Sequence, residues 1–129
     1  MKAILIDALN KEVKEVQVSG GGDSIREQIG NGCTTFCCPI VLDNGDTIYA
    51  DDEGWFNFGF NEETGEGNMG GFAAEGYMYP MVGKFLILGC DEEGESVDCK
   101  SSVEDIKNYV TRWYSASEMN QWGYRLGVL

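Results

Sequence analysis

A predicted β-hairpin in the middle of the chain constrains the fold more than any other stretch. Residues 33–42 and residues 47–50 are both rich in strand-forming side chains. Asn44 and Gly45 stand between them, and this pair is typical of the positive-φ positions of a type I′ turn. Pro39 has no backbone N–H to donate, so we expect it at a sheet edge or a bulge. The sequence therefore predicts an antiparallel strand pair here.

Three further strands are expected. Residues 3–7 form a short apolar run, which predicts a core strand. Residues 11–18 alternate charged and apolar side chains, with Val16 and Val18 on one face, so these two segments predict a second hairpin. Residues 84–90 form an unbroken apolar run, which is typical of a strand buried on both faces.

Capping signals mark the expected helices. Ser24 followed by Glu27 predicts a short helix over residues 24–29. Ser101 followed by Glu104 predicts the start of a main helix near residues 102–113, and another short helix is expected over residues 116–122. The main helix would present an apolar face made of Val103, Ile106, Val110 and Trp113.

Together these elements predict an α+β fold in a single domain of 129 residues. We expect a mostly antiparallel or mixed sheet of about five or six strands, with one main C-terminal helix and a short helix packed on it. Residues 55–82 are interpreted as an aromatic, glycine-rich insertion or extended hairpin, and residues 114–129 as a C-terminal extension. The sheet is expected to bury Ile4, Ile6, Val16, Val41, Ile48, Phe85 and Ile87.

The charge is strongly negative and unevenly distributed. The chain has 22 acidic and 9 basic residues, and its formal net charge is −13. Residues 43–98 contain 14 of the acids and a single base, Lys84. Such a surface repels phosphate groups, which argues against direct binding of nucleic acid or of an anionic membrane. A basic protein partner, a cation and mimicry of the charge of DNA stay open, as does a surface that is merely solvated.

The residue pattern gives little support to catalysis or metal binding. The chain has no histidine and no nucleophile beside a base, so we predict that it is not an enzyme. The glycine run at residues 20–22 is not followed by the lysine of a P-loop. Cys33 and Cys37 are spaced almost as zinc ligands are, but Cys90 and Cys99 are not. The acidic runs do not follow calcium-loop spacing. We therefore predict no metal and no cofactor.

The expected location is the cytoplasm, or the host cytoplasm if the protein is viral. No run approaches the roughly 18 apolar residues that a membrane-spanning helix needs, and the first ten residues do not resemble a signal peptide. The five cysteines are then expected to be reduced thiols.

The best candidate for a binding surface combines carboxylates with aromatic rings. Exposed aromatic side chains anchor protein interfaces, and they also stack on planar ligands. The alternative is that these rings fill the protein's own core. The predicted partner-binding residues are Asp51, Asp52, Glu53, Trp55, Phe56, Phe58, Phe60, Tyr77, Tyr79, Asp91, Glu92 and Glu93.

Four segments occur in an order that resembles a small domain-of-unknown-function family of phages, plasmids and bacteria. They are MKAILID, LDNGDTIYADDEG, GKFLILGCDEEGESVD and SVEDIKNYV. The resemblance covers about residues 1–54 and 77–113, whereas residues 55–76 and the tail after Trp113 depart from it. It implies a small α+β fold and an origin in a mobile element, and it offers no catalytic residue.

Three functions follow as hypotheses. The first is a non-enzymatic acidic binding protein of a mobile element, which occupies a basic surface on a host defence or nucleic-acid-handling protein. The alternative is a protein that binds or sequesters a nucleotide-like small molecule, with Arg26, Lys84 and Arg112 meeting the phosphates. The second alternative is a structural or assembly protein, such as a homodimer formed through the aromatic segments.

Overall fold

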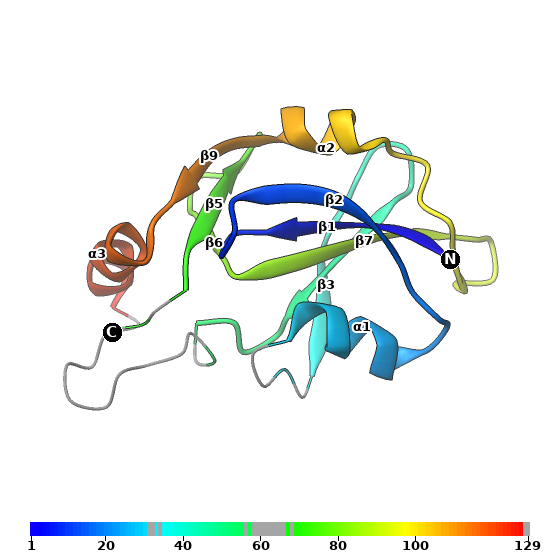
Figure 1. The fold of residues 1–129 in the computed structure, drawn as a ribbon, viewed down its shortest axis with the longest axis horizontal. Coiled ribbons are helices and arrows are strands. Elements are labelled where there is room, and N and C mark those ends of the chain that lie inside the picture. Colours follow the sequence, from blue (N-terminus) through cyan, green and yellow to red (C-terminus); the bar gives the residue numbers. More distant parts are fainter. Residues whose placement is uncertain (31–32, 34, 56, 58–66, 68, 128–129) are drawn as a thin grey trace.

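The computed structural model describes the chain except for residues 31–32, 34, 56, 58–66, 68 and 128–129. The described residues form nine strands in two antiparallel sheets and three helices, so the α+β prediction is confirmed (Figure 1). The main sheet has the order β2–β1–β7–β4–β3, with β8 paired to β7. Its strands are β1 (Lys2–Asp7), β2 (Glu12–Gln17), β3 (Phe36–Val41), β4 (Thr47–Asp51), β7 (Lys84–Cys90) and β8 (Ser96–Val97).

A second, smaller sheet has the order β6–β5–β9. Its strands are β5 (Gly71–Ala74), β6 (Met81–Val82) and β9 (Val110–Tyr114). The helices are α1 (Gly22–Ile29), α2 (Val103–Tyr109) and α3 (Ala116–Leu126). Helices α1 and α2 lie on opposite sides of the main sheet, and α3 lies beside the second sheet (Figure 1).

Strand β7 is the centre of the main sheet, and the prediction that it is buried on both faces is confirmed. Ile87 packs on one face with Ile4, Ile48 and the α2 residue Ile106. Leu86 and Leu88 pack on the other face with Leu5 and both isoleucines of α1. Burying apolar side chains on each face of one strand gives the protein two cores that share a sheet.

Two of the predicted core residues do not lie where we expected. Val16 is only half-buried, and Val41 is 66% exposed. The pairing of β3 with β4 shifts register between Cys37 and Ile40, around Pro39. The bulge turns Ile40 toward the core instead of Val41, because neighbouring strand residues point to opposite faces. The predicted edge position and bulge of Pro39 are both confirmed.

The central hairpin exists, but the prediction of a type I′ turn is wrong. Val41 pairs with Thr47, and the Leu42 N–H donates to the Asp46 carbonyl over 2.8 Å. The loop therefore has three residues, and Gly45 has a φ of +91° while Asn44 does not have a positive φ. A three-residue loop that ends in a glycine of positive φ is the common next choice for a hairpin.

A buried carboxylate ties this hairpin to the segment before α2. Asp46 is fully buried, and it accepts hydrogen bonds from the backbone N–H groups of Lys100 and Ser101 over 3.0 and 2.8 Å. The Ser101 hydroxyl donates to the same carboxylate over 2.6 Å, and the Asn44 amide donates to that hydroxyl oxygen over 2.9 Å. A buried charge with these donors is a structural group, because each donor would otherwise lose a partner.

The predicted helix boundaries need correction. Helix α1 begins at Gly22, so Ser24 is not its N-cap. The capping box of α2 is made by Ser102 and Asp105, one residue later than predicted. The expected main helix over residues 102–113 ends at Tyr109, and the following residues form β9.

The pairing of β9 with β5 explains why the helix stops. Val110, Thr111, Trp113 and Tyr114 are β-branched or aromatic residues, which favour a strand, and β9 pairs with β5. The longest helix is α3, which contains the short helix expected over residues 116–122 and extends to Leu126.

The segment interpreted as an insertion contributes directly to the core. Strands β5 and β6 come from it, and Phe72 of β5 is fully buried. Its ring packs edge-on against Phe85 of the main sheet, with 5.0 Å between ring centroids. This contact joins the second sheet to the first.

Candidate functional site

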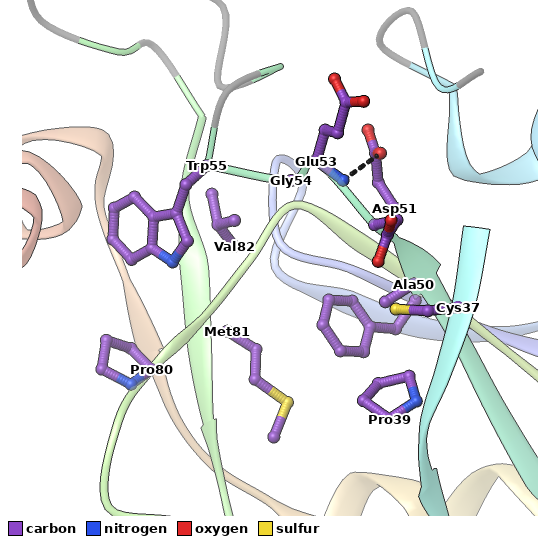
Figure 2. A pocket seen from close by; sticks show the side chains of 12 residues that line it. Cys37, Pro39, Ala50, Asp51, Glu53, Gly54, Trp55, Pro80, Met81 and Val82 are labelled. Carbon is purple, nitrogen blue, oxygen red and sulfur yellow. Dashed lines mark hydrogen bonds between the residues drawn. The ribbon is translucent and has the colours of Figure 1, made fainter. Parts of the chain in front are cut away.

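A groove of about 530 Å³ lies where the end of β4 meets β3 and β6 (Figure 2). Its walls are apolar and include Pro39, Ala50, Trp55, Met81 and Phe85. Its rim carries three acidic residues in a row, which are Asp51, Asp52 and Glu53. The groove joins apolar walls to a row of three carboxylates.

A tight turn after β4 positions the acidic rim. The Asp51 carboxylate accepts hydrogen bonds from the Glu53 N–H and from the Asn57 amide, each over 2.9 Å (Figure 2 shows the first). The Gly54 N–H also donates to the Asp51 carbonyl over 3.1 Å. Asp51 is thus held by its own turn, which leaves Asp52 and Glu53 exposed to solvent.

The opposite wall comes from β6 and from Trp55. Figure 2 shows Trp55, Pro80 and Met81 on one side of the groove and Cys37 and Pro39 on the other. Trp55 packs against the small cluster of Met69, Val82 and Met119. Pro80 is buried, and Met81 pairs with Phe72 in the second sheet. The groove therefore lies between the two sheets, at the edge formed by β3.

Two cysteine thiols lie beside the rim, and both are held in the protonated form at neutral pH. Burial, and then the charge and hydrogen bonding of Asp51, raise the pKa of Cys33 to about 11. Burial, and then Asp52, likewise raise the pKa of Cys37. A protonated thiol is a poor nucleophile and a poor metal ligand. Among the described residues, no group of three or more cysteine or acidic side chains is arranged to hold a metal ion.

The groove brings together four of the residues predicted from the sequence, namely Asp51, Asp52, Glu53 and Trp55. Tyr77 and Tyr79 lie in the loop between β5 and β6 and are 47% and 55% exposed. The Tyr79 ring contacts Trp122 of α3 edge-on, with 6.3 Å between centroids. Phe56, Phe58 and Phe60 lie outside the described residues.

The second acidic run is not part of this site. Asp91, Glu92 and Glu93 form the exposed turn between β7 and β8. Because Thr47 pairs with Leu88 and Tyr49 with Leu86, the Asp51 end of β4 lies near Lys84 and not near Asp91. Six residues lie between Lys84 and Asp91. The seven steps from one to the other correspond to roughly 23 Å of extended chain. The antiparallel register thus places the two acidic runs at opposite ends of the sheet.

Sequence reasoning missed most of the groove walls. Pro39, Pro80 and Phe85 come from three different strands or loops, and only the fold brings them together. Pro39 did carry a signal, because a proline in a strand marks an edge where a groove can open.

The basic residues proposed for phosphate binding do not converge on the groove. Arg26 forms an ion pair with Asp23 within α1, and Arg112 forms one with Glu118 over 2.6 Å. Lys84 lines a separate small hollow together with Asp51. An anionic ligand in the groove would face the carboxylates of the rim and not these cations.

Comparison of the chain with protein-family models, with curated proteins and with solved structures finds no match. The resemblance noted in the sequence therefore stays a prediction, and function has to be argued from the groove itself. No helix in the described ranges is long and apolar enough to cross a membrane.

Proposed function

We propose that this protein is a non-enzymatic binding protein whose groove receives a basic segment of a partner protein. One observation carries the proposal, which is the acidic rim of Asp51, Asp52 and Glu53 above apolar walls. Arginine and lysine have an apolar stem and a cationic head, so one such side chain matches both parts of the groove. Trp55 adds apolar area to the wall that the stem of such a side chain would contact.

The described residues that line the groove suit a binding role. Cys37 is the one thiol among them, and burial and Asp52 raise its pKa. The remaining lining residues are carboxylates, apolar side chains and a glycine. This set suits the recognition of a cation better than the transfer of a group.

The experiment compares two matched charge reversals in a binding assay. The probe is a fluorescein-labelled peptide with one arginine flanked by valines. Its binding to the protein is measured by fluorescence anisotropy at low and at high salt. The D52K/E53K variant is expected to bind about thirtyfold more weakly, because an attractive rim becomes repulsive. The E92K/E93K variant makes the same change of charge at the far turn, and we expect less than about a threefold effect there.

The outcomes separate a local site from a general charge effect. Equal weakening by both variants would mean that net charge alone attracts the peptide. Binding that ignores ionic strength would contradict the charge mechanism. The identity of the partner, including a host defence or nucleic-acid-handling protein, stays a prediction that affinity capture with the D52K/E53K variant as control would address.

One observation favours self-association as a second candidate. Tyr77, Met78 and Tyr79 follow one another in the β5–β6 loop, and Met78 is 81% exposed. Exposed aromatic and methionine side chains are typical of the centres of interfaces. Light scattering over a range of concentrations tests this, and a constant monomer mass would refute it.

A further inference from the structure

The groove continues along β3 toward the central hairpin. Two further hollows, of about 350 and 440 Å³, follow it along this strand and share Leu42, Asp43, Glu75 and Tyr109. Strand β3 forms one side of the first two hollows, and the β5–β6 loop forms their other side. The third hollow lies beyond the end of β3 and is lined by Leu42, Asp43 and Asn44 of the hairpin loop. We call this set of three hollows, which follows residues 37–43, the β3 channel.

The outer edge of β3 has backbone groups available for pairing at Val41, on the hairpin side of the bulge, whereas Pro39 has no N–H to donate. Strand β3 ends the main sheet, and no described strand pairs with its outer side. The Leu42 N–H donates inward to the Asp46 carbonyl, so Leu42 occupies a hydrogen-bonded position of the ladder. Such positions alternate along an antiparallel strand, and the N–H and C=O of Val41 therefore point away from β4. Val41 is also 66% exposed.

Both ends of the β3 channel are acidic, and its middle is apolar. Asp51, Asp52 and Glu53 stand at one end, and Asp43 and Glu75 stand at the other. Pro39, Pro80 and Tyr77 lie between these ends. From Phe36, which pairs with Asp51, to Asp43 the chain takes seven steps, and the bulge removes one of them from the length of the edge. The remaining six steps span roughly 20 Å, which is the length of about seven extended residues.

A polar group without a partner lies at the hairpin end. The Tyr109 hydroxyl is buried and has no hydrogen-bond partner among the described residues. Tyr109 lines both of the smaller hollows. Burial, and then the neighbouring Tyr77 and Glu75, raise the pKa of Tyr109 to about 12, so the hydroxyl keeps its proton and remains a donor at neutral pH. The hydroxyl oxygen itself is closed off from the surface, so in this structure it is a cost to stability at the hairpin end and not a contact for the peptide.

We propose that the partner segment binds as an added strand along the free edge of β3, with a basic residue near each end of a core of about seven residues. This inference rests on the proposed function and adds the binding mode and the motif. Strand addition gives affinity through backbone hydrogen bonds, and the hollows select alternate side chains. The acidic ends at Asp51–Glu53 and at Asp43 and Glu75 require two cations, and the apolar middle requires apolar side chains between them.

The first test varies the spacing between two arginines in labelled peptides that otherwise alternate valine and serine. Arginines at positions 1 and 7 match the length of the β3 channel, whereas arginines at positions 1 and 5 or 1 and 9 do not. We expect the matched peptide to bind about tenfold more tightly than each of the two mismatched peptides. The same difference is expected relative to the peptide with one arginine. Equal affinity for all spacings would overturn the inference.

The second test removes one outward backbone donor. Val41→Pro deletes the N–H that faces the added strand, and the edge of a sheet tolerates proline when that N–H is not paired within the sheet. We expect about tenfold weaker binding of the matched peptide, whereas Val41→Thr, which keeps the N–H, is expected to change it by less than about twofold. Binding of the single-arginine peptide to V41P serves as the check that the groove is intact.

A charge reversal keeps the inference testable if V41P does not fold. The D43K/E75K variant changes only the hairpin end, and we expect it to abolish the preference for the matched spacing while leaving single-arginine binding within about twofold. Loss of the single-arginine site in D52K/E53K with no effect of spacing would retain the proposed function and refute strand addition. No binding of any arginine peptide would refute both. If the protein forms a stable dimer that the matched peptide does not dissociate, the edge of β3 pairs with a second copy of this chain and the inference of a peptide partner is refuted.

Discussion

The two acidic turns of this protein have similar sequences and very different surroundings. Asp51, Asp52 and Glu53 follow β4 and form the rim of a groove with apolar walls. In the turn that begins at Asp91, the Asp91 carboxylate accepts hydrogen bonds from the Glu93 and Glu95 N–H groups, each over 2.9 Å. Its remaining acidic side chains extend into solvent.

The difference teaches that a carboxylate run becomes a candidate site only through what lies beside it. Exposed charges in water attract a cation weakly and are screened by salt. Asp51 is half-buried in a groove that it shares with Trp55 and Met81, and the stem of a basic side chain also gains apolar contact there. The following predictions test this contrast, from the largest expected effect to the smallest.

Asp46 differs from the acidic residues of both turns, because it is buried and its carboxylate stabilises the fold. Asp46→Ala leaves three donors from Lys100 and Ser101 without their acceptor inside the fold. We expect the free energy of unfolding to fall by about 3 kcal/mol. Denaturant unfolding measures this, with Glu92→Ala as the control that should change stability by less than about 0.5 kcal/mol. A small effect of D46A would show that the hairpin does not depend on this carboxylate.

The apolar wall is expected to matter as much as the acidic rim. Trp55→Ala removes the largest ring beside the carboxylates, and we expect the single-arginine peptide to bind about 2 kcal/mol more weakly. Tyr124→Ala removes an aromatic side chain that is 53% exposed on α3, away from the groove, and should leave binding unchanged. Anisotropy measured well below the melting temperature of each variant makes the comparison. Equal losses would contradict a local site.

The Tyr109 hydroxyl, which has no partner among the described residues, predicts an effect on stability and little effect on binding. Tyr109→Phe removes a buried donor that lacks a partner, so we expect the unliganded protein to be stabilised by about 1 kcal/mol. Because the hydroxyl oxygen is not accessible from the surface, the affinity for the matched peptide should change by less than about twofold. Thermal melts and anisotropy on the same samples test both expectations. A variant that is less stable would mean that the hydroxyl has a partner in solution.

The thiol beside the rim gives the smallest predicted effect and a dependence on pH. Burial and Asp52 raise the pKa of Cys37, so a smaller fraction is thiolate at pH 8 than for an ordinary cysteine. Iodoacetamide reacts with the thiolate, so Cys37 should react slowly at pH 8 and faster as the pH rises toward the raised pKa. Asp52→Asn should lower that pKa and speed the reaction a few-fold, whereas Glu92→Gln should not. Peptide mass mapping of the alkylated protein follows each cysteine separately.

Much of the fold could be predicted from local patterns. The apolar run of β7 and the alternation in β2 indicated their positions, because burial on one or two faces leaves a trace in the sequence. The residues of β9 misled the helix prediction, since Val110 and Trp113 also fit helical spacing. Pairing with β5 makes this segment a strand and not a helix, and such long-range pairing leaves no local signal in the sequence.

The candidate site was predictable only in part. The carboxylates at residues 51–53 and Trp55 were identified, because charge and aromatic content are visible in the sequence. The separation of the two acidic runs was not visible, since it depends on the register of β4 against β7. The exposure of Val41 depends on the bulge in β3. The lack of a hydrogen-bond partner for the Tyr109 hydroxyl among the described residues depends on packing between the sheets.

The most direct test of the account is an NMR titration of the ¹⁵N-labelled protein with the matched two-arginine peptide. We predict that the backbone amide of Val41 and the indole N–H of Trp55 shift, together with the amides of Asp52 and Glu53. The amides of Glu92 and Glu93 should not move. Shifts centred on the turn at residues 91–95, or spread evenly over all acidic residues, would contradict a binding site between β3 and the second sheet.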